Sequence, residues 1–135
     1  MSEDREEPQI IYIDRSDKAT YDKLVEKGGP LEGMEYKYIF LLAMALGYIN
    51  NIKTESIERI PGGLFRTSYL NTYEKAIIKA IAIAEEGSLD ALLDKRKIYS
   101  LAEQYATGGI KILQNIAFDK FGKDLYKKLL DELKR

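Results

Sequence analysis

The sequence predicts an all-α protein that folds as a single compact bundle of about five helices, with one short N-terminal strand as an option. Between residues 95 and 116, apolar side chains recur at helical spacing for five turns. Two further stretches, 39–46 and 76–84, are almost continuously apolar. A chain of 135 residues is also long enough to bury a core of its own. These observations favour one helical domain over residues 9–135.

The N-terminal part is predicted to contain a lead, a short extended segment and one helix. Residues 1–8 are charged and end at a proline, which is typical of a disordered lead. Gln9–Ile13 is rich in β-branched residues and suits a short strand, but it has no obvious partner in the chain. It would therefore pair with a second copy or pack as coil. Asp14 or Ser16 then caps a helix that runs to about Lys27 and ends at the following glycine pair.

Two apolar helices follow. The first covers Met34–Ile49 and needs cover on most sides, so we expect it at the centre of the bundle. Residues 50–70 have no regular pattern. Asn71, with Glu74 three places on, forms a capping box for a second apolar helix, 72–86. We expect this helix to be the best packing partner of the first.

The C-terminal part begins with two caps. Ser88 caps a short turn through Leu92 and Leu93, and Asp94 caps a long helix that starts at Lys95. Gly108-Gly109 lies inside that helix, so either another helix approaches closely there or the helix breaks in two. We favour one helix, kinked or straight, that continues to about residue 118. A last helix is predicted over 123–134.

The composition excludes much chemistry. The chain has no His and no Cys, so it has no disulfide, no thiolate nucleophile and no Ser-His-Asp triad. We therefore predict no catalytic residue, no metal ligand and no cofactor. The one enzymatic alternative is a carboxylate-metal hydrolase built on an acidic cluster, which comprises Glu85, Glu86, Asp90 and Asp94. The simpler interpretation is that these acids are helix caps and surface charges.

The C-terminal third is basic, with 10 Lys and Arg against 5 Asp and Glu in residues 95–135. On a helix, Lys97 and Lys111 fall on the same side and Arg96 lies nearby. We predict a nucleic-acid contact at these residues and at Lys95, through the phosphate backbone. A solvated helix surface is the simpler alternative, and an isoelectric point near 5.6 argues against a dedicated nucleic-acid binder.

Targeting signals are not apparent. The N-terminus is acidic where a signal peptide would be basic, and the longest apolar run, Ile39–Ile49, is well short of the ~20 residues that cross a bilayer. We therefore expect a cytoplasmic protein without membrane contact. Two apolar helices are more than a small monomer easily covers, so self-association or a protein partner is expected.

Three strings of residues suggest a family. They are Phe40–Tyr48, Ala80–Gly87 followed by Leu92-Leu93-Asp94, and Ala102–Ile110, preceded by Tyr12-Ile13 and a helix. Together they resemble small proteins encoded beside DNA phosphorothioation (Dnd-type sulfur modification) systems in prokaryotic defence islands. The resemblance covers about residues 10–118. It implies a non-catalytic accessory or adaptor protein in a DNA-modification or restriction context and assigns no catalytic residue.

Overall fold

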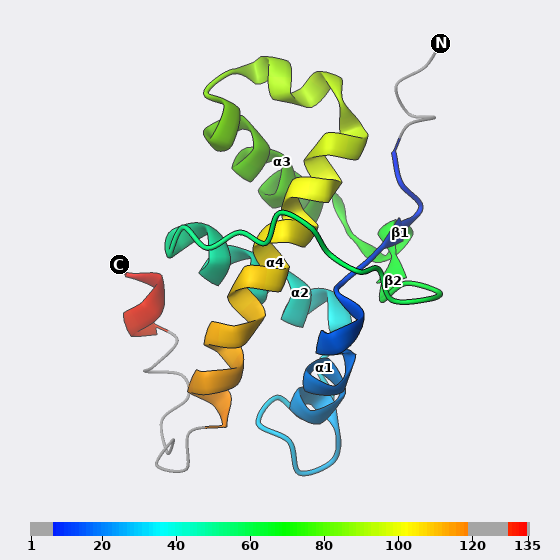
Figure 1. The fold of residues 1–135 in the computed structure, drawn as a ribbon, viewed down its shortest axis with the longest axis vertical. Helices are drawn as coiled ribbons and strands as arrows, with labels where there is room; N and C mark the ends of the chain where they lie inside the picture. Colours follow the sequence, from blue (N-terminus) through cyan, green and yellow to red (C-terminus); the bar gives the residue numbers. More distant parts are fainter. Residues whose placement is uncertain (1–6, 119–129, 135) are drawn as a thin grey trace.

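The computed structural model describes residues 7–118 and 130–134. Four α-helices make up most of this part of the chain, and one two-stranded sheet is present in it (Figure 1). The predicted fold class, a mostly α-helical bundle, is confirmed. The predicted disordered lead falls mainly on residues 1–6, which lie outside the described residues. The predicted last helix does so in part, and residues 130–133 are helical.

The predicted strand has a partner within the chain. Strand β1 (Ile10–Ile11) pairs antiparallel with β2 (Phe65–Arg66), and Ile10 lies opposite Arg66. The expectation that this segment pairs with a second copy or packs as coil was wrong. Strand β2 could not be predicted from the sequence, because it is only two residues long and lies in the irregular stretch 50–70.

The first helix is shorter than predicted. Asp14 accepts a hydrogen bond from the Ser16 amide and caps a 3-10 turn, after which α1 covers Lys18–Val25. The helix ends two residues before Lys27, because the backbone at Glu26 is already extended. Gly28 follows with a φ of +84°, which favours glycine.

The two apolar helices lie close to their predicted bounds. Helix α2 covers Tyr36–Ile49 and α3 covers Thr72–Glu86. Both hydrogen bonds of the capping box between Asn71 and Glu74 are present at 2.8 Å. Gly87 adopts the left-handed conformation that ends α3.

The long helix is continuous. Ser88 and Asp94 act as predicted, by capping a 3-10 turn over Leu89–Leu93 and helix α4 over Lys95–Ala117. Helix α4 passes through Gly108-Gly109 without a break. Figure 1 shows α4 crossing the molecule from top to bottom, with the other helices arranged around it.

The glycines of α4 are required by the close approach of α2. A methyl group at Gly109 would lie 2.5 Å from the Gly47 amide nitrogen and closer still to the carbonyl oxygen of Ala43. A methyl group at Gly47 would in turn collide with the carbonyl of Tyr105. The two backbones therefore touch, and of the two explanations for the glycine pair, close helix packing is confirmed.

This contact also corrects the predicted helix pairing. Helix α2 packs mainly on α4 and touches α3 only slightly, so the expectation that the two apolar helices are best partners was wrong. Gly47 and Gly109 at the α2–α4 crossing let the two backbones touch, and α3 contains no glycine that would permit such an approach. The centre of the core lies at this crossing and includes Phe40, Met44, Ala106 and Ile110.

We predict that Gly109→Ala lowers the free energy of unfolding by about 1–3 kcal/mol, the usual range for overpacking. Intrinsic propensity acts in the other direction, since alanine favours a helix by about 1 kcal/mol over glycine. The measurement is urea unfolding followed by circular dichroism. Asn115→Ala, at an exposed position of the same helix, is the control and should change stability by less than about 0.5 kcal/mol. Equal stability of the two variants would contradict the described crossing.

Candidate functional site

The first turn of α4 carries the predicted basic cluster on a ridge between two clefts. Arg96 lines one cleft and Lys97 lines the other. Lys111 lies four turns further along, about 20 Å away at 1.5 Å per residue. The structure therefore keeps Lys95, Arg96 and Lys97 at one end of the helix and does not bring Lys111 to them.

Lys111 has a different role. Its ammonium group lies 2.6 Å from Oδ1 of Asp17, whose side chain is only 2% exposed. This ion pair joins α4 to the start of α1. Because a buried carboxylate without a partner is costly, the pair stabilises the fold and engages the charge that was predicted to contact phosphate.

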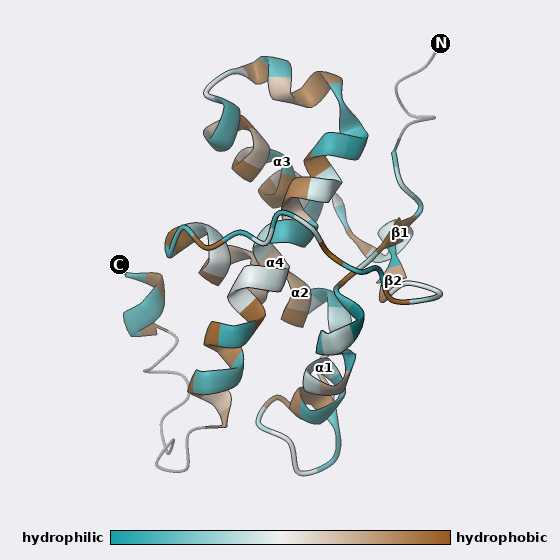
Figure 2. Ribbon diagram, viewed as in Figure 1, coloured by the Kyte–Doolittle hydropathy of each residue, from teal (hydrophilic) through white to brown (hydrophobic). Residues whose placement is uncertain are grey.

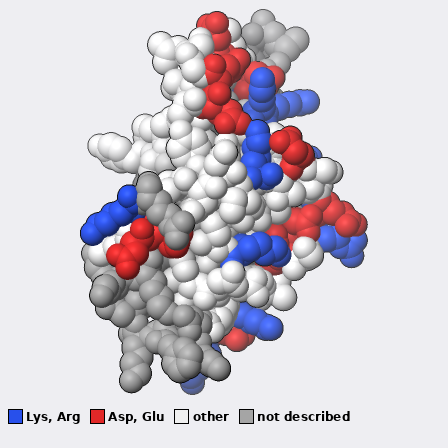
Figure 3. Space-filling model, turned by 60° about the vertical axis from the view of Figure 1, so that its left-hand side comes forward, with Lys and Arg blue, Asp and Glu red and all other residues white. Residues whose placement is uncertain are grey.

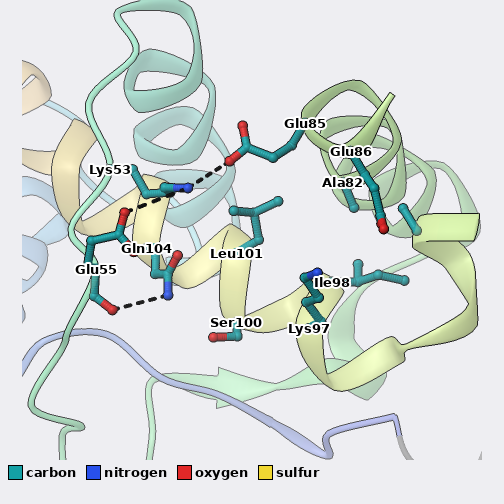
Figure 4. A pocket seen from close by; sticks show the side chains of 11 residues that line it. Lys53, Glu55, Ala82, Glu85, Glu86, Lys97, Ile98, Ser100, Leu101 and Gln104 are labelled. Carbon is teal, nitrogen blue, oxygen red and sulfur yellow. Dashed lines mark hydrogen bonds and ion pairs between the residues drawn. The ribbon is translucent and has the colours of Figure 1, made fainter. Parts of the chain in front are cut away.

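The Lys97 cleft, named after this wall residue, lies between α3, α4 and the segment after α2. Figure 4 shows Lys53, Glu55 and Gln104 at one end, Lys97 at the other, and Leu101 between them. Lys53 lies 2.7 Å from Glu85 and 3.8 Å from Glu55. With Glu86 also on the wall, three acids face two bases, so this cleft does not favour a polyanion.

The residues of the predicted acidic cluster have different positions and partners in the structure. Glu85 accepts hydrogen bonds from Lys53 and from the Tyr105 hydroxyl, both at 2.7 Å, and these bonds hold the pKa of its carboxyl below the usual value. Asp94 caps α4, and Asp90 lies in the first turn of the 3-10 segment. In residues 7–118 and 130–134 no three acidic side chains are close enough together to hold a metal ion.

The second cleft, which we call the Glu103 cleft, lies between β1, the loop that carries Arg59, and α4. Its volume is about 470 Å³. The Glu103 side chain comes from the middle of α4, and the residue is only 3% exposed. Its Oε2 accepts a hydrogen bond of 2.8 Å from the backbone amide of Tyr12.

Burial raises the pKa of Glu103 to about 7, against the opposing effects of the Tyr12 amide and the nearby Arg59 guanidinium. Arg59 stacks over the Tyr12 ring, with Cζ 4.7 Å from the ring centroid. This buried carboxyl group therefore changes charge near neutral pH. Such groups concentrate at functional sites, although structural networks also contain them.

Glu103 and Arg59 belong to no functional motif that can be recognised in the sequence. One signal was available for Glu103: it follows Arg96 by seven residues and Tyr99 by four, so all three share one face of a helix. No comparable signal existed for Arg59, because only the path of the loop brings it to Glu103 across 44 residues of chain.

A third feature is an exposed apolar surface on α3. Ile78, Ile81 and Ala82 face the core, but a second apolar side of the helix remains open. Tyr73 is 83% exposed and Ile77 is 49% exposed. We call this the α3 outer face; it consists of Tyr73, Ala76, Ile77, Ala80 and Ala84.

The α3 outer face borders α2. Lys37 near the start of α2 lies 2.9 Å from Glu74 near the start of α3. At the C-terminal ends of the two helices, Tyr48 of α2 and Ala84 of α3 line the same hollow. Figure 2 shows hydrophobic residues along α3, and Figure 3 shows a broad area without charged groups on the side that carries α3 and the end of α2. The α3 outer face therefore lies beside α2, with an ion pair at one end and a shared hollow at the other.

In the part of the chain that the structure describes, no helix is both long and apolar enough to cross a membrane.

We predict a pH-dependent contribution of Glu103 to stability. Its pKa is higher in the folded protein than the ordinary 4.5, so the folded state keeps this proton while the unfolded state loses it. Stability should therefore fall as pH rises from 4.5 to about 7, by at most roughly 3 kcal/mol, and change no further above that window.

Glu103→Gln removes the titrating carboxyl group and retains an oxygen that can accept the hydrogen bond from the Tyr12 amide. Urea unfolding across the pH range should show the variant gaining stability relative to the natural protein as pH rises through the window. Glu86→Gln, at an exposed position, is the matched control and should show no such change. A pH-independent difference for Glu103→Gln would refute the raised pKa.

Comparisons of the chain with protein-family models, curated proteins and solved structures found no match. The resemblance to proteins of DNA phosphorothioation systems therefore stays a prediction.

Proposed function

We propose that this protein is a non-catalytic accessory or adaptor protein that works by binding another protein, in the DNA-modification or restriction context that its sequence resemblance implies. The observation that carries the proposal is the second apolar side of α3, with Tyr73 and Ile77 exposed to solvent. Apolar surfaces of this kind are typical of protein interaction sites.

The composition of the surface supports this interpretation. Two tyrosines, Tyr73 and the neighbouring Tyr69, are exposed at its N-terminal end, and tyrosine is enriched where proteins bind each other. Three alanines, Ala76, Ala80 and Ala84, follow at intervals of four residues. Small residues on one helix face let a partner helix pack closely, and the exposed Ile77 beside them supplies apolar contact area.

We predict that Ile77→Asp weakens partner binding at least tenfold, because it places a charge in the apolar contact. The partner is first captured from the native host, then purified and titrated calorimetrically against the natural protein and each variant. Lys79→Asp introduces the same side chain on another side of α3 and should change affinity less than about twofold. Equal affinity of both variants would exclude the α3 outer face as the binding surface.

Light scattering separates the adaptor role from its main alternative, self-assembly. A natural protein that is a stable dimer, with Ile77→Asp a monomer and no other partner captured, would favour a structural homo-oligomer. A monomer that binds the captured partner supports the adaptor.

DNA contact is a second part of the proposal, placed at the start of α4. Arg96 and Lys97 are exposed there next to Lys95. The acids around the Lys97 cleft and the ion pair of Lys111 reduce the positive surface, so any contact should be weak and salt-sensitive.

We predict that a triple Lys95/Arg96/Lys97→Ala variant loses DNA retention on a low-salt gel. Lys111→Ala should retain it, because that ammonium group already binds Asp17. Circular dichroism checks that both variants fold. No retention of the natural protein at any salt concentration would remove DNA from the proposed function.

A further inference from the structure

The Glu103 cleft has a buried polar group that the fold uses only in part. Within the described residues, the one hydrogen-bond donor to the Glu103 carboxyl is the Tyr12 amide, which binds Oε2. The second oxygen, Oε1, has no such donor, and Glu103 lines the cleft. Oε1 is not enclosed by protein, because in the described residues the one buried side-chain polar atom without a hydrogen bond is the Tyr21 hydroxyl. Oε1 therefore remains open to the cleft, where a ligand can reach it.

Two arginines line the same cleft. Arg59 lies over the Tyr12 ring, and Arg96 projects from the first turn of α4. Neither guanidinium has an ion pair with an acid in the described part of the chain. Guanidinium groups present planar sets of donors that match the oxygens of carboxylates and phosphates, so these two groups retain unused capacity for an anion.

The other charged group of the cleft is already engaged. Glu7 accepts a hydrogen bond of 2.7 Å from the Tyr99 hydroxyl and lies 3.4 Å from Lys75. Although burial opposes them, these partners and the more distant Lys95 lower the pKa of Glu7, so it is ionised at neutral pH. Glu7 therefore does not neutralise the two arginines by direct contact.

We infer that the Glu103 cleft binds a small organic anion, whose carboxylate or phosphate group lies between Arg59 and Arg96 and meets the Glu103 carboxyl group. The cleft volume of about 470 Å³ suits a small molecule. This ligand site is separate from the α3 outer face, so it does not rest on the proposed protein contact. It shares Arg96 with the proposed DNA contact, whereas Arg59 belongs to the ligand site alone.

Proton uptake follows from the arrangement. An anion beside Glu103 disfavours its charged form, so the bound complex holds a proton at this carboxyl. Of the charged groups that line the cleft, Arg59 favours the charged form of Glu103. Arg96 and Glu7, of opposite charge, line the same cleft. Because binding takes up a proton, affinity should rise as pH falls from about 8 to about 6.

Calorimetric titration of the full chain tests the proposal with three probes: sulfate, succinate and AMP. The charge of sulfate does not change over this pH range. Succinate and AMP distinguish a site for carboxylates from a site for phosphates. We expect at least one probe to bind with one-to-one stoichiometry, several-fold more tightly near pH 6 than near pH 8. If no probe binds at either pH, the inference is wrong.

Variants locate the site. Arg59→Ala and Arg96→Ala should each weaken binding at least about fivefold, whereas Arg66→Ala, an exposed arginine outside the cleft, should not. Glu103→Gln imitates the protonated acid, so it should retain binding and remove its pH dependence. Loss of binding in Glu103→Gln would show that the carboxylate recognises a donor group and would overturn the assignment of an anion.

Discussion

The contact of the α2 backbone with the α4 backbone is the constraint on which the rest of the structure depends. Gly47 and Gly109 leave no room for a methyl group, so the two helices approach more closely than ordinary side chains permit. This contact sets the position of α4, and α4 carries the residues that line both clefts, including Arg96, Lys97 and Glu103. A shift at the glycines would move all of these side chains together.

Two polar residues of α4, Lys111 and Glu103, differ in their partners. Lys111 binds the buried Asp17 and fixes the helix against α1. Glu103 is about as buried as Asp17. It has only a backbone amide as its hydrogen-bond donor, and it faces a cleft with two arginines. The buried carboxylate of Asp17 has an ammonium group as its partner, and this ion pair stabilises the fold. The Glu103 carboxyl group has one oxygen without a hydrogen-bond donor, and that oxygen can bind a ligand. A similar contrast holds for α3, whose inner side builds the core and whose outer side is exposed to solvent.

Local features were predicted well. The capping box at Asn71 and Glu74 and the caps at Ser88 and Asp94 all involve residues within a few positions of each other. Contacts between distant residues were not predicted. The partner of β1 lies more than 50 residues away, and Tyr12 meets Glu103 across 91 positions. Helical periodicity identifies the buried side of α2, but it does not identify the helix that covers it.

The sequence by itself determined which segments are helical, where most of them begin and end, and which reactions a chain without histidine and cysteine cannot perform. The tertiary structure alone decided that Lys111 belongs to an ion pair, that Arg96 and Lys97 face different clefts, and that Arg59 lines the same cleft as the buried Glu103. The physical reason is range: caps and periodicity act over one or two turns, whereas the surroundings of a charge depend on every segment that packs around it.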